Sequence, residues 1–286
     1  DVFDDVGTFA SMKIDSNNFA HIAYRDETHN KLKYARVDLN KPINSILDQT
    51  IESVTTGGIS AALAVTHDGT VYIAHQVYDL IDGKIFYFAQ NQNGIWKFDF
   101  LKDSDLISPL QLTSIALDNN EVPHVAIALL GNHLSEFTIN NDFIETPIEN
   151  EDGAFPSIAI SKNNNEHIAY NSVFNIRLAT KEENAWSIED LLTTRGYAGV
   201  KTAVDSENSV FVFYSEPDVA TITCAIKSNG NWIYHLIDEN VLTFDPLNIV
   251  KGTNFDIAID SNDRIHLVYY DFITHRLTYG TTADVE

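Results

Sequence analysis

Short stretches of alternating apolar and polar residues recur along the chain and are joined by polar turns. Residues 11–15 and 19–24 form the first such pair. Alternation with period two is typical of strands with one buried face, and the connecting turns are rich in Asn, Asp, Ser and Gly. No stretch shows a convincing helical period. The pattern predicts an all-β protein made of antiparallel strands.

This pair of strands recurs six times when each unit is aligned on one anchor position. The anchors are Asp15, Thr66, Asp118, Ser161, Asp205 and Asp260. They are 43 to 55 residues apart, which is the length of a four-stranded propeller blade, about 40–50 residues. A third strand follows at residues 31–35, 224–226 and 276–279, and a fourth begins near Trp96, Trp186 or Trp232. We therefore predict one domain, residues 1–286, folded as a six-bladed β-propeller of four-stranded blades.

The two ends of the chain bear on how the propeller closes. The residues after Asp260 suffice for two more strands but contain no tryptophan-led fourth strand. We expect residues 2–5 to supply the outer strand of the last blade, because a closed ring leaves no long exposed edge. Glycine stands eight residues before four anchors, where an unusual φ is expected as the chain enters a new blade. These glycines are Gly7, Gly58, Gly153 and Gly252.

Charge and composition exclude several classes of partner. The chain has 18 Lys and Arg against 41 Asp and Glu, a net charge of −23. Such a surface repels nucleic acid and anionic lipid. The longest apolar run, residues 125–130, is far shorter than the roughly 20 residues of a membrane span. A single cysteine, Cys224, excludes an internal disulfide and a cysteine-rich metal site.

The repeat unit resembles that of a known family. Asp15-Ser-Asn with His21-Ile-Ala-Tyr24, and Asp260-Ser-Asn with His266-Leu-Val-Tyr-Tyr-Asp271, are similar to the unit S-I-A-x-D-S-N-G-x-P-H-I-x-Y-Y-D of secreted bacterial and archaeal propeller proteins. The resemblance spans the chain and implies a propeller that is sialidase-like or lyase-like in the broad sense. It also implies an extracellular, cell-surface or periplasmic location. The sialidase Asp-box is not met, and a propeller by itself does not define a function.

Residue types that recur at one slot of the repeat are interpreted as scaffold. They comprise the second-strand histidines His21, His124, His167 and His266, and the tyrosines Tyr24, Tyr170, Tyr214 and Tyr269. We expect the histidines to be core imidazoles bonded to backbone or carboxylate groups, with metal ligation as the alternative. The tryptophans are interpreted as blade-edge packing, with sugar platforms as the alternative. Cys224 is expected to be a buried inert thiol.

Departures from the repeat are candidates for function. Lys13, Lys201 and Asp256 replace the small residues of the other units on first strands of blades 1, 5 and 6, which adjoin in a closed ring. A charge leaving water is costly unless it is paired. We therefore predict a Lys13–Lys201–Asp256 cluster near the central channel, with an ordinary solvated or structural ion pair as the alternative.

A second group of departures falls on the loops at one face of a propeller, where ligands commonly bind. The predicted ligand-binding residues are Arg25, Asp26, His75, Gln76, Arg195, Tyr197, Glu216, Tyr270 and Asp271. Arg25, His75, Arg195 and Tyr197 are the catalytic candidates, because an arginine can neutralise a uronate carboxylate while His or Tyr moves a proton. No nucleophile–base motif accompanies them, so the sequence leaves open whether the protein is an enzyme. Simple surface solvation is the alternative.

Oxygen-rich turns such as residues 15–18, 118–120 and 260–263 raise calcium as a candidate cofactor. None has EF-hand spacing, and tight turns select the same residues, so no metal site is assigned. The leading hypothesis is an extracellular binding module for a glycan or a protein partner. A polysaccharide lyase or glycosidase is the first alternative, and a structural or assembly protein is the second.

Overall fold

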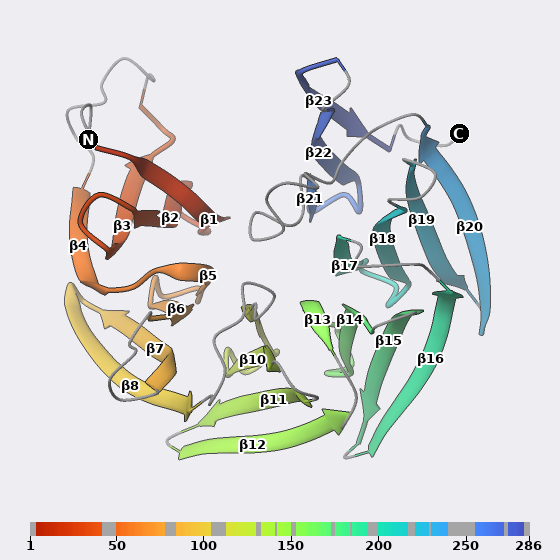
Figure 1. Cartoon of the computed structure of the whole chain (residues 1–286), viewed down its shortest axis with the longest axis horizontal. Helices are drawn as coiled ribbons and strands as arrows, with labels where there is room; N and C mark the ends of the chain where they lie inside the picture. Colours follow the sequence, from red (N-terminus) through yellow and green to blue (C-terminus); the bar gives the residue numbers. More distant parts are fainter. Residues whose placement is uncertain are drawn as a thin grey trace. The chain divides into compact units, whose positions relative to one another are not determined.

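The described part of the chain folds into strands β1 to β23, arranged in six antiparallel sheets in this computed structural model (Figure 1). The structure describes residues 4–41, 50–77, 84–103, 113–129, 133–140, 142–149, 153–172, 175–183, 185–193, 199–216, 221–228, 230–239, 255–271 and 274–282. Within each sheet the strands are neighbours in sequence order. The prediction of an all-β protein of repeated antiparallel units is confirmed.

Sheet 1 consists of β1 (Val6–Ile14), β2 (Phe19–Asp26), β3 (Lys31–Asp38) and β4 (Thr50–Thr56). Sheet 2 consists of β5 (Ile59–Val65), β6 (Val71–Gln76), β7 (Lys84–Gln92) and β8 (Ile95–Asp103). Sheet 3 consists of β9 (Thr113–Leu117), β10 (Pro123–Leu129), β11 (His133–Asn140) and β12 (Asp142–Glu149).

Sheet 4 consists of β13 (Ala154–Ile160), β14 (Glu166–Asn171), β15 (Asn175–Glu182) and β16 (Ala185–Thr193). Sheet 5 consists of β17 (Val200–Val204), β18 (Val210–Glu216), β19 (Thr221–Ser228) and β20 (Asn231–Asp238). Sheet 6 consists of β21 (Phe255–Ile259), β22 (Ile265–Asp271) and β23 (Arg276–Thr281). The strands predicted to open near Trp96, Trp186 and Trp232 are β8, β16 and β20.

The chain forms two compact units. The first comprises residues 1–107, 113–125 and 137–144, and the second comprises residues 108–112, 126–136 and 145–286. Sheets 1 and 2 share an apolar core around Leu32, Leu63 and Ile73 in the first unit. In the second unit, Ile176 and Val212 belong to a core shared by sheets 4 and 5. Whether residues 1–286 act as one domain stays a prediction.

The turn between the first two strands of each unit has the same backbone form throughout. The residue three positions after the anchor has a positive φ in all six units, namely Asn18, Gly69, Glu121, Asn164, Asn208 and Asp263. Asn and Gly tolerate this left-handed conformation, which explains their frequency at this slot. The anchor carboxylate closes the turn: Asp15 Oδ1 accepts hydrogen bonds from the backbone N–H groups of Asn17 and Phe19, at 2.9 and 2.8 Å.

The crossing from sheet 1 to sheet 2 requires glycine. Gly57 and Gly58 have φ values of +95° and +87°. A Cβ atom would lie 2.5 Å from the Gln76 carbonyl oxygen at Gly57 and 2.9 Å from Leu32 Cα at Gly58.

The expectation of an unusual φ before the anchors is confirmed at Gly58, and also at Gly7 with φ +102°. The expectation is wrong at Gly153, which is not among the positive-φ residues. A Cβ atom at Gly153 would lie 3.0 Å from Leu134 Cβ, so close packing explains this glycine. Gly252 lies outside the described residues.

Closure of the last sheet by residues 2–5 is not shown. Sheet 6 has three strands among the described residues. Asp5 is not in a strand, and its backbone is bound to the β2–β3 turn of sheet 1, where its N–H donates to Thr28 Oγ1 at 2.8 Å and its carbonyl accepts from Glu27 N–H at 2.9 Å. Residues 2 and 3 lie outside the described residues, so the closing strand stays a prediction.

Candidate functional site

A tyrosine recurs where one sheet of the second unit packs against the preceding one. At the junction of sheets 3 and 4, the Tyr170 hydroxyl on β14 donates a hydrogen bond to the Glu149 carboxylate at the end of β12. Arg177 on β15 binds the same carboxylate and also donates from Nε to Asp190 Oδ1 at 2.7 Å. Tyr170 is fully buried. Polar side chains therefore fill this junction.

These contacts shift the pKa values of the groups involved. Burial raises the pKa of Tyr170, and the neighbouring Glu149 carboxylate raises it further. Burial lowers the pKa of Arg177, but the bonded Asp190 and the charge of Glu149 outweigh burial and raise it. Both groups stay in their ordinary protonation states, so the junction is an ion pair with a neutral phenol.

The junction of sheets 5 and 6 repeats the tyrosine–carboxylate contact, with Thr278 in the slot that Arg177 holds in sheet 4. The Tyr269 hydroxyl on β22 donates to Asp238 Oδ2 at the end of β20. Burial raises the pKa of Tyr269 to about 12, with a further contribution from the Asp238 carboxylate. The two acceptors occupy the same position in their strands. Glu149 stands six residues after Phe143 on β12, and Asp238 stands six residues after Trp232 on β20.

The junction of sheets 4 and 5 lacks this acceptor. Six residues after Trp186 stands Leu192, and the residue paired with Tyr214 across β18 and β19 is Thr223 rather than an arginine. A cavity of about 500 Å³ opens at this position. Its lining residues are Leu191, Leu192, Tyr214, Glu216, Thr223, Tyr234 and Leu236, and we call it the β16–β20 pocket.

The β16–β20 pocket combines an apolar floor with a few polar groups. Tyr234 and Leu236 on β20 are 48% and 58% exposed and form its solvent side, whereas Tyr214 is buried. Glu216 Oε1 accepts a hydrogen bond from Thr223 Oγ1 at 3.2 Å, and the Tyr234 hydroxyl donates to the Leu191 carbonyl at 3.1 Å. Burial raises the pKa of Tyr214, and the negative charge of Glu216 adds to it. The pocket thus offers one carboxylate, hydroxyl groups and apolar surface, and its lining contains no cation among the residues that the structure describes.

Among the sequence-predicted ligand-binding residues, Glu216 lines this pocket. Arg25 is 9% exposed and already engaged: it donates to Glu27 Oε2, Asn30 Oδ1 and the Gly57 carbonyl at 2.7, 2.9 and 2.8 Å. It ties the β2–β3 turn to the entrance of sheet 2, so the structure gives it a scaffold role. Arg195 and Tyr197 lie outside the described residues.

His75 and Gln76 are buried as well. The His75 ring stacks on Tyr87 with a centroid separation of 6.0 Å, and its Nδ1 lies 3.3 Å from the Gln76 carbonyl oxygen. His75 is 0% exposed, and burial lowers its pKa to about 4. A ring this inaccessible does not meet a substrate at a loop surface.

The remaining predicted mouth residues stabilise turns. Asp26 and Asp271 are buried at the ends of β2 and β22. Asp26 accepts from the backbone N–H of His29 at 2.9 Å, and Asp271 accepts from the Thr274 hydroxyl. Tyr270 is half-buried, with its hydroxyl 3.4 Å from His275 Nδ1.

The predicted charge cluster is found in part. Lys201 Nζ and Asp256 Oδ1 form an ion pair at 3.0 Å between β17 and β21. Asp256 is largely exposed, which agrees with an ordinary surface pair. Lys13 is exposed and belongs to the other compact unit, so its place in a three-charge cluster stays a prediction.

The recurring histidines are bonded within their own sheets. His21 Nε2 lies 3.2 Å from Asp15 Oδ2 and its Nδ1 lies 2.7 Å from the Tyr34 hydroxyl. His266 makes the same pair of contacts, with Asp260 and Tyr279, at 3.3 and 2.6 Å. The expectation of histidines bonded to carboxylates agrees with these contacts. Cys224 is buried, and burial raises its pKa to about 12, which suits an inert thiol.

Comparison with known proteins supports the fold. No protein-family model matches the chain, and no curated sequence matches it. The structure is similar to the Aleuria aurantia lectin described as having a six-bladed propeller fold and a novel mode of fucose recognition, with a TM-score of 0.65 at 10% identity over 100% of this chain and 93% of that one. The fold is a six-bladed β-propeller.

Two further structures share this propeller. The SapL1 lectin in complex with α-methyl fucoside has a TM-score of 0.65 at 10% identity, covering 97% of this chain and 94% of that one. A protein of unknown function from Dyadobacter fermentans has a TM-score of 0.60 at 12% identity, covering 96% and 93%. The sialidase-like part of the sequence resemblance finds no support among these structures.

Sequence reasoning missed most of the β16–β20 pocket. Leu192, Thr223, Tyr234 and Leu236 were not singled out, because none is unusual for a strand residue. The sequence does contain one indication of the pocket, six residues after the aromatic residue near the start of the fourth strand of a sheet. This position holds Glu149 in sheet 3 and Asp238 in sheet 5, but Leu192 in sheet 4. A buried tyrosine beside a slot that holds leucine instead of an acid marks the opening.

Proposed function

We propose that the chain is a glycan-binding module, with the β16–β20 pocket as a binding site. The observation that carries this proposal is that Leu192 occupies, beside the β16–β20 pocket, the slot that holds an acceptor carboxylate at the junctions of sheets 3 and 4 and of sheets 5 and 6. Sugar sites commonly combine apolar or aromatic surface with a few placed polar groups. Tyr234 and Leu236 offer a surface for the apolar face of a sugar ring, and the Glu216 carboxylate offers an acceptor for its hydroxyls.

The charges of the pocket favour neutral sugars. Among its described lining residues Glu216 is the charged one, and the whole chain carries a net charge of −23. A uronate or sialate carboxylate entering the pocket would meet like charge without a partner, which is costly. This differs from the uronate chemistry considered for Arg25 and Arg195. Fucosylated glycans are the first probes, because two similar propellers are described as fucose-bound or fucose-recognising.

The test is a glycan array followed by isothermal titration with the strongest neutral glycan. We expect binding that weakens by about tenfold or more in Glu216→Gln, because a charge-assisted hydrogen bond contributes roughly 1.5–3 kcal/mol. Glu207→Gln is the matched control, since this exposed glutamate lies on the β17–β18 turn of the same sheet. Absence of binding to any glycan would overturn the proposed function, and equal affinity in both variants would remove the pocket from it.

An extracellular or cell-surface location fits a glycan-binding role and remains part of the proposal. No helix among the described residues is long and apolar enough to cross a membrane. Product analysis on neutral and acidic polysaccharides tests the enzymatic alternative: the proposal expects intact polymer after incubation, whereas shortened or unsaturated products would replace it with a lyase or glycosidase.

A further inference from the structure

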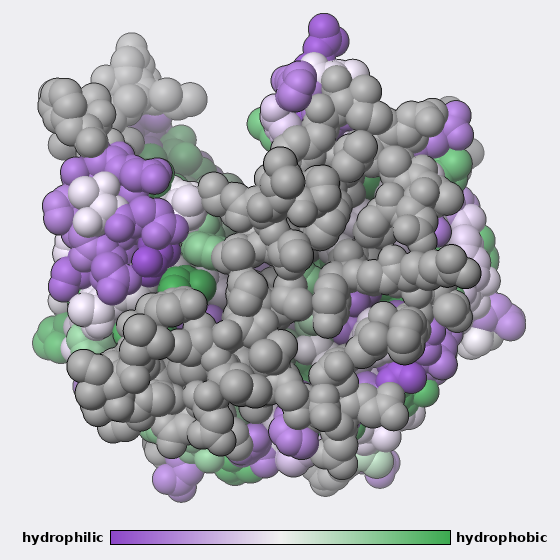
Figure 2. Space-filling view, in the orientation of Figure 1, coloured by the Kyte–Doolittle hydropathy of each residue, from purple (hydrophilic) through white to green (hydrophobic). Residues whose placement is uncertain are grey.

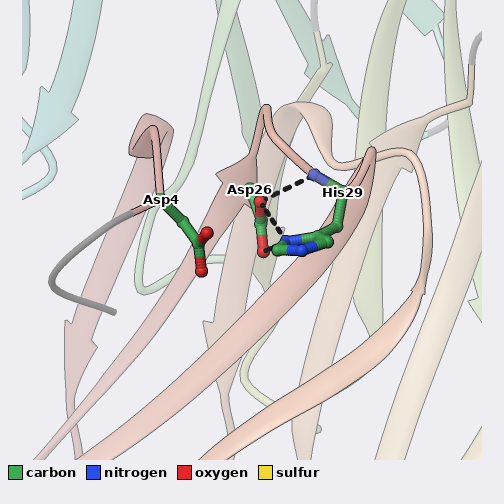
Figure 3. Close-up of side chains that lie close together, drawn as sticks. All are labelled: Asp4, Asp26 and His29. Atoms are coloured by element: carbon green, nitrogen blue, oxygen red, sulfur yellow. Dashed lines mark hydrogen bonds and ion pairs between the residues drawn. The ribbon is translucent and has the colours of Figure 1, made fainter.

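A cluster of three metal-ligating side chains lies at the start of sheet 1, separate from the β16–β20 pocket. Asp4 precedes β1, Asp26 ends β2 and His29 lies in the β2–β3 turn. One donor atom from each lies within 4.8 Å of the other two. Figure 3 shows the Asp4 carboxylate turned toward Asp26, whose side chain lies between Asp4 and the His29 ring.

The repeat separates what the turn requires from what is added to it. In sheet 6 the Asp271 carboxylate accepts from the Thr274 hydroxyl, at the slots held in sheet 1 by Asp26 and His29. A threonine therefore suffices to hold this turn. The imidazole of His29 is therefore not required to form the turn. Its Nδ1 lies 2.9 Å from Asp26 Oδ2.

The third ligand is held in place by the backbone that follows it. The two hydrogen bonds of Asp5 to Thr28 and Glu27 dock this segment against the β2–β3 turn. Asp4 is thereby kept beside Asp26, which is 2% exposed. A buried carboxylate gains from a nearby cation, and Lys33 Nζ approaches Asp26 Oδ2 only to 4.0 Å.

We propose that Asp4, Asp26 and His29 form a binding site for a divalent transition-metal ion of the zinc type. Two carboxylates and one imidazole are a zinc ligand set, with about 2.0–2.2 Å from metal to each ligand atom and a remaining position for water. Ligand atoms bound to one tetrahedral ion are then about 3.3–3.6 Å apart, whereas the three donor atoms lie within 4.8 Å of one another, so binding requires side-chain shifts of up to about 1.5 Å. The ion takes the place of the hydrogen between His29 Nδ1 and Asp26 Oδ2: the Nδ1 proton leaves to solvent and Nε2 carries a proton taken from solvent, so His29 binds as a neutral imidazole.

The site accepts an ion from the solvent because His29 has a side chain that is 57% exposed. On the face shown in Figure 2, the described side chains over sheet 1 are largely hydrophilic. Bound metal would join residues on three parts of the chain: the segment before β1, the end of β2 and the β2–β3 turn. It would therefore fix the segment before β1 to sheet 1 and raise the thermal stability of the protein.

The experiment is titration of the full chain with Zn²⁺ by calorimetry, together with Co²⁺ absorption as a spectroscopic readout. We expect one ion per chain, and an affinity lower by on the order of tenfold or more in each of Asp4→Asn and His29→Thr. His29→Thr copies the turn of sheet 6, so the turn is retained while a metal ligand is lost. His275→Ala, which removes an exposed histidine from the sheet 6 turn, is the control and should bind zinc as the parent does.

Two results would overturn the proposal. One is equal zinc affinity in the parent, Asp4→Asn and His29→Thr, which would mean adventitious binding elsewhere. The other is binding of Ca²⁺ in preference to Zn²⁺, because an oxygen-only site has no use for the imidazole. A Zn²⁺-dependent rise in melting temperature in the parent, absent from Asp4→Asn, supports the proposal independently of calorimetry.

Discussion

The junctions at Tyr170 and Tyr214 are built from the same slots of the repeat but end in opposite results. At the first, Glu149 and Arg177 fill the space around the tyrosine hydroxyl. At the second, Leu192 and Thr223 leave a cavity of about 500 Å³. A repeated scaffold thus opens a cavity where one contact is lost. The surrounding units show what that contact would otherwise be.

Sealing the pocket is expected to have the largest effect. The double substitution Leu192→Glu with Thr223→Arg copies the Glu149–Arg177 pair into the junction of sheets 4 and 5. We expect glycan binding to fall below detection, because the new side chains occupy the cavity. The measurement is titration calorimetry, with circular dichroism to show that the strands are intact; binding that survives in a folded double variant would mean that the sugar lies elsewhere.

Breaking the filled junction is expected to lower stability. Arg177→Met leaves Glu149 and Asp190 without their cation, and the arginine side chain is only 17% exposed. Loss of one partner of a buried pair costs roughly 3–5 kcal/mol, and partial exposure reduces the expected loss of unfolding free energy to about 2–3 kcal/mol. Urea unfolding measures it, and Thr223→Met at the open junction is the comparison, for which we expect a smaller loss. Equal losses at the two junctions would contradict this account.

Removing the Tyr170 hydroxyl is expected to lower stability more than removing the Tyr214 hydroxyl. Tyr170→Phe leaves Glu149 short of one donor, which is expected to cost about 1.5–2 kcal/mol of unfolding free energy. Tyr214→Phe removes a hydroxyl that is hydrogen-bonded to the neutral Thr223, and should cost about 1 kcal/mol or less. Urea unfolding of the two single variants tests this order, and the reverse order would contradict it.

The same tyrosine slot holds His75 in sheet 2, where it is expected to make stability depend on pH. Burial lowers the pKa of His75 from 6.5 to about 4, so below pH 6.5 the unfolded chain binds a proton that the folded chain does not. Stability is therefore complete above pH 6.5 and falls toward pH 4, by at most about 1.4 kcal/mol per pH unit for this group. His75→Phe should flatten the unfolding free energy over this range. The exposed His67→Asn is the control, and an unchanged slope in His75→Phe would refute the assignment.

Much of the fold could be predicted because it depends on local patterns. Period-two alternation locates the strands, and the spacing of anchors such as Asp15 and Asp260 sets the blade length. Side-chain surroundings were harder to predict. Arg25 and His75 depart from the repeat as functional residues often do, yet each is buried and bonded within the scaffold. Sequence alone cannot distinguish a departure that repacks a core from one that meets a ligand.

The β16–β20 pocket shows the converse limit. Its defining change is a leucine in place of an acid, and an apolar residue in a strand attracts no attention on its own. Only the neighbouring Tyr170–Glu149 and Tyr269–Asp238 bonds reveal that Leu192 occupies the slot of an acceptor. The pairing of residues between consecutive sheets is a tertiary relation, which the sequence repeat suggests but does not specify.

A crystal structure of the chain with the neutral glycan that binds best is the most direct test of the pocket assignment. We expect sugar density between β16 and β20, with a hydroxyl within hydrogen-bonding distance of the Glu216 carboxylate and the ring against Tyr234. Density at another position, with the β16–β20 pocket empty, would contradict it.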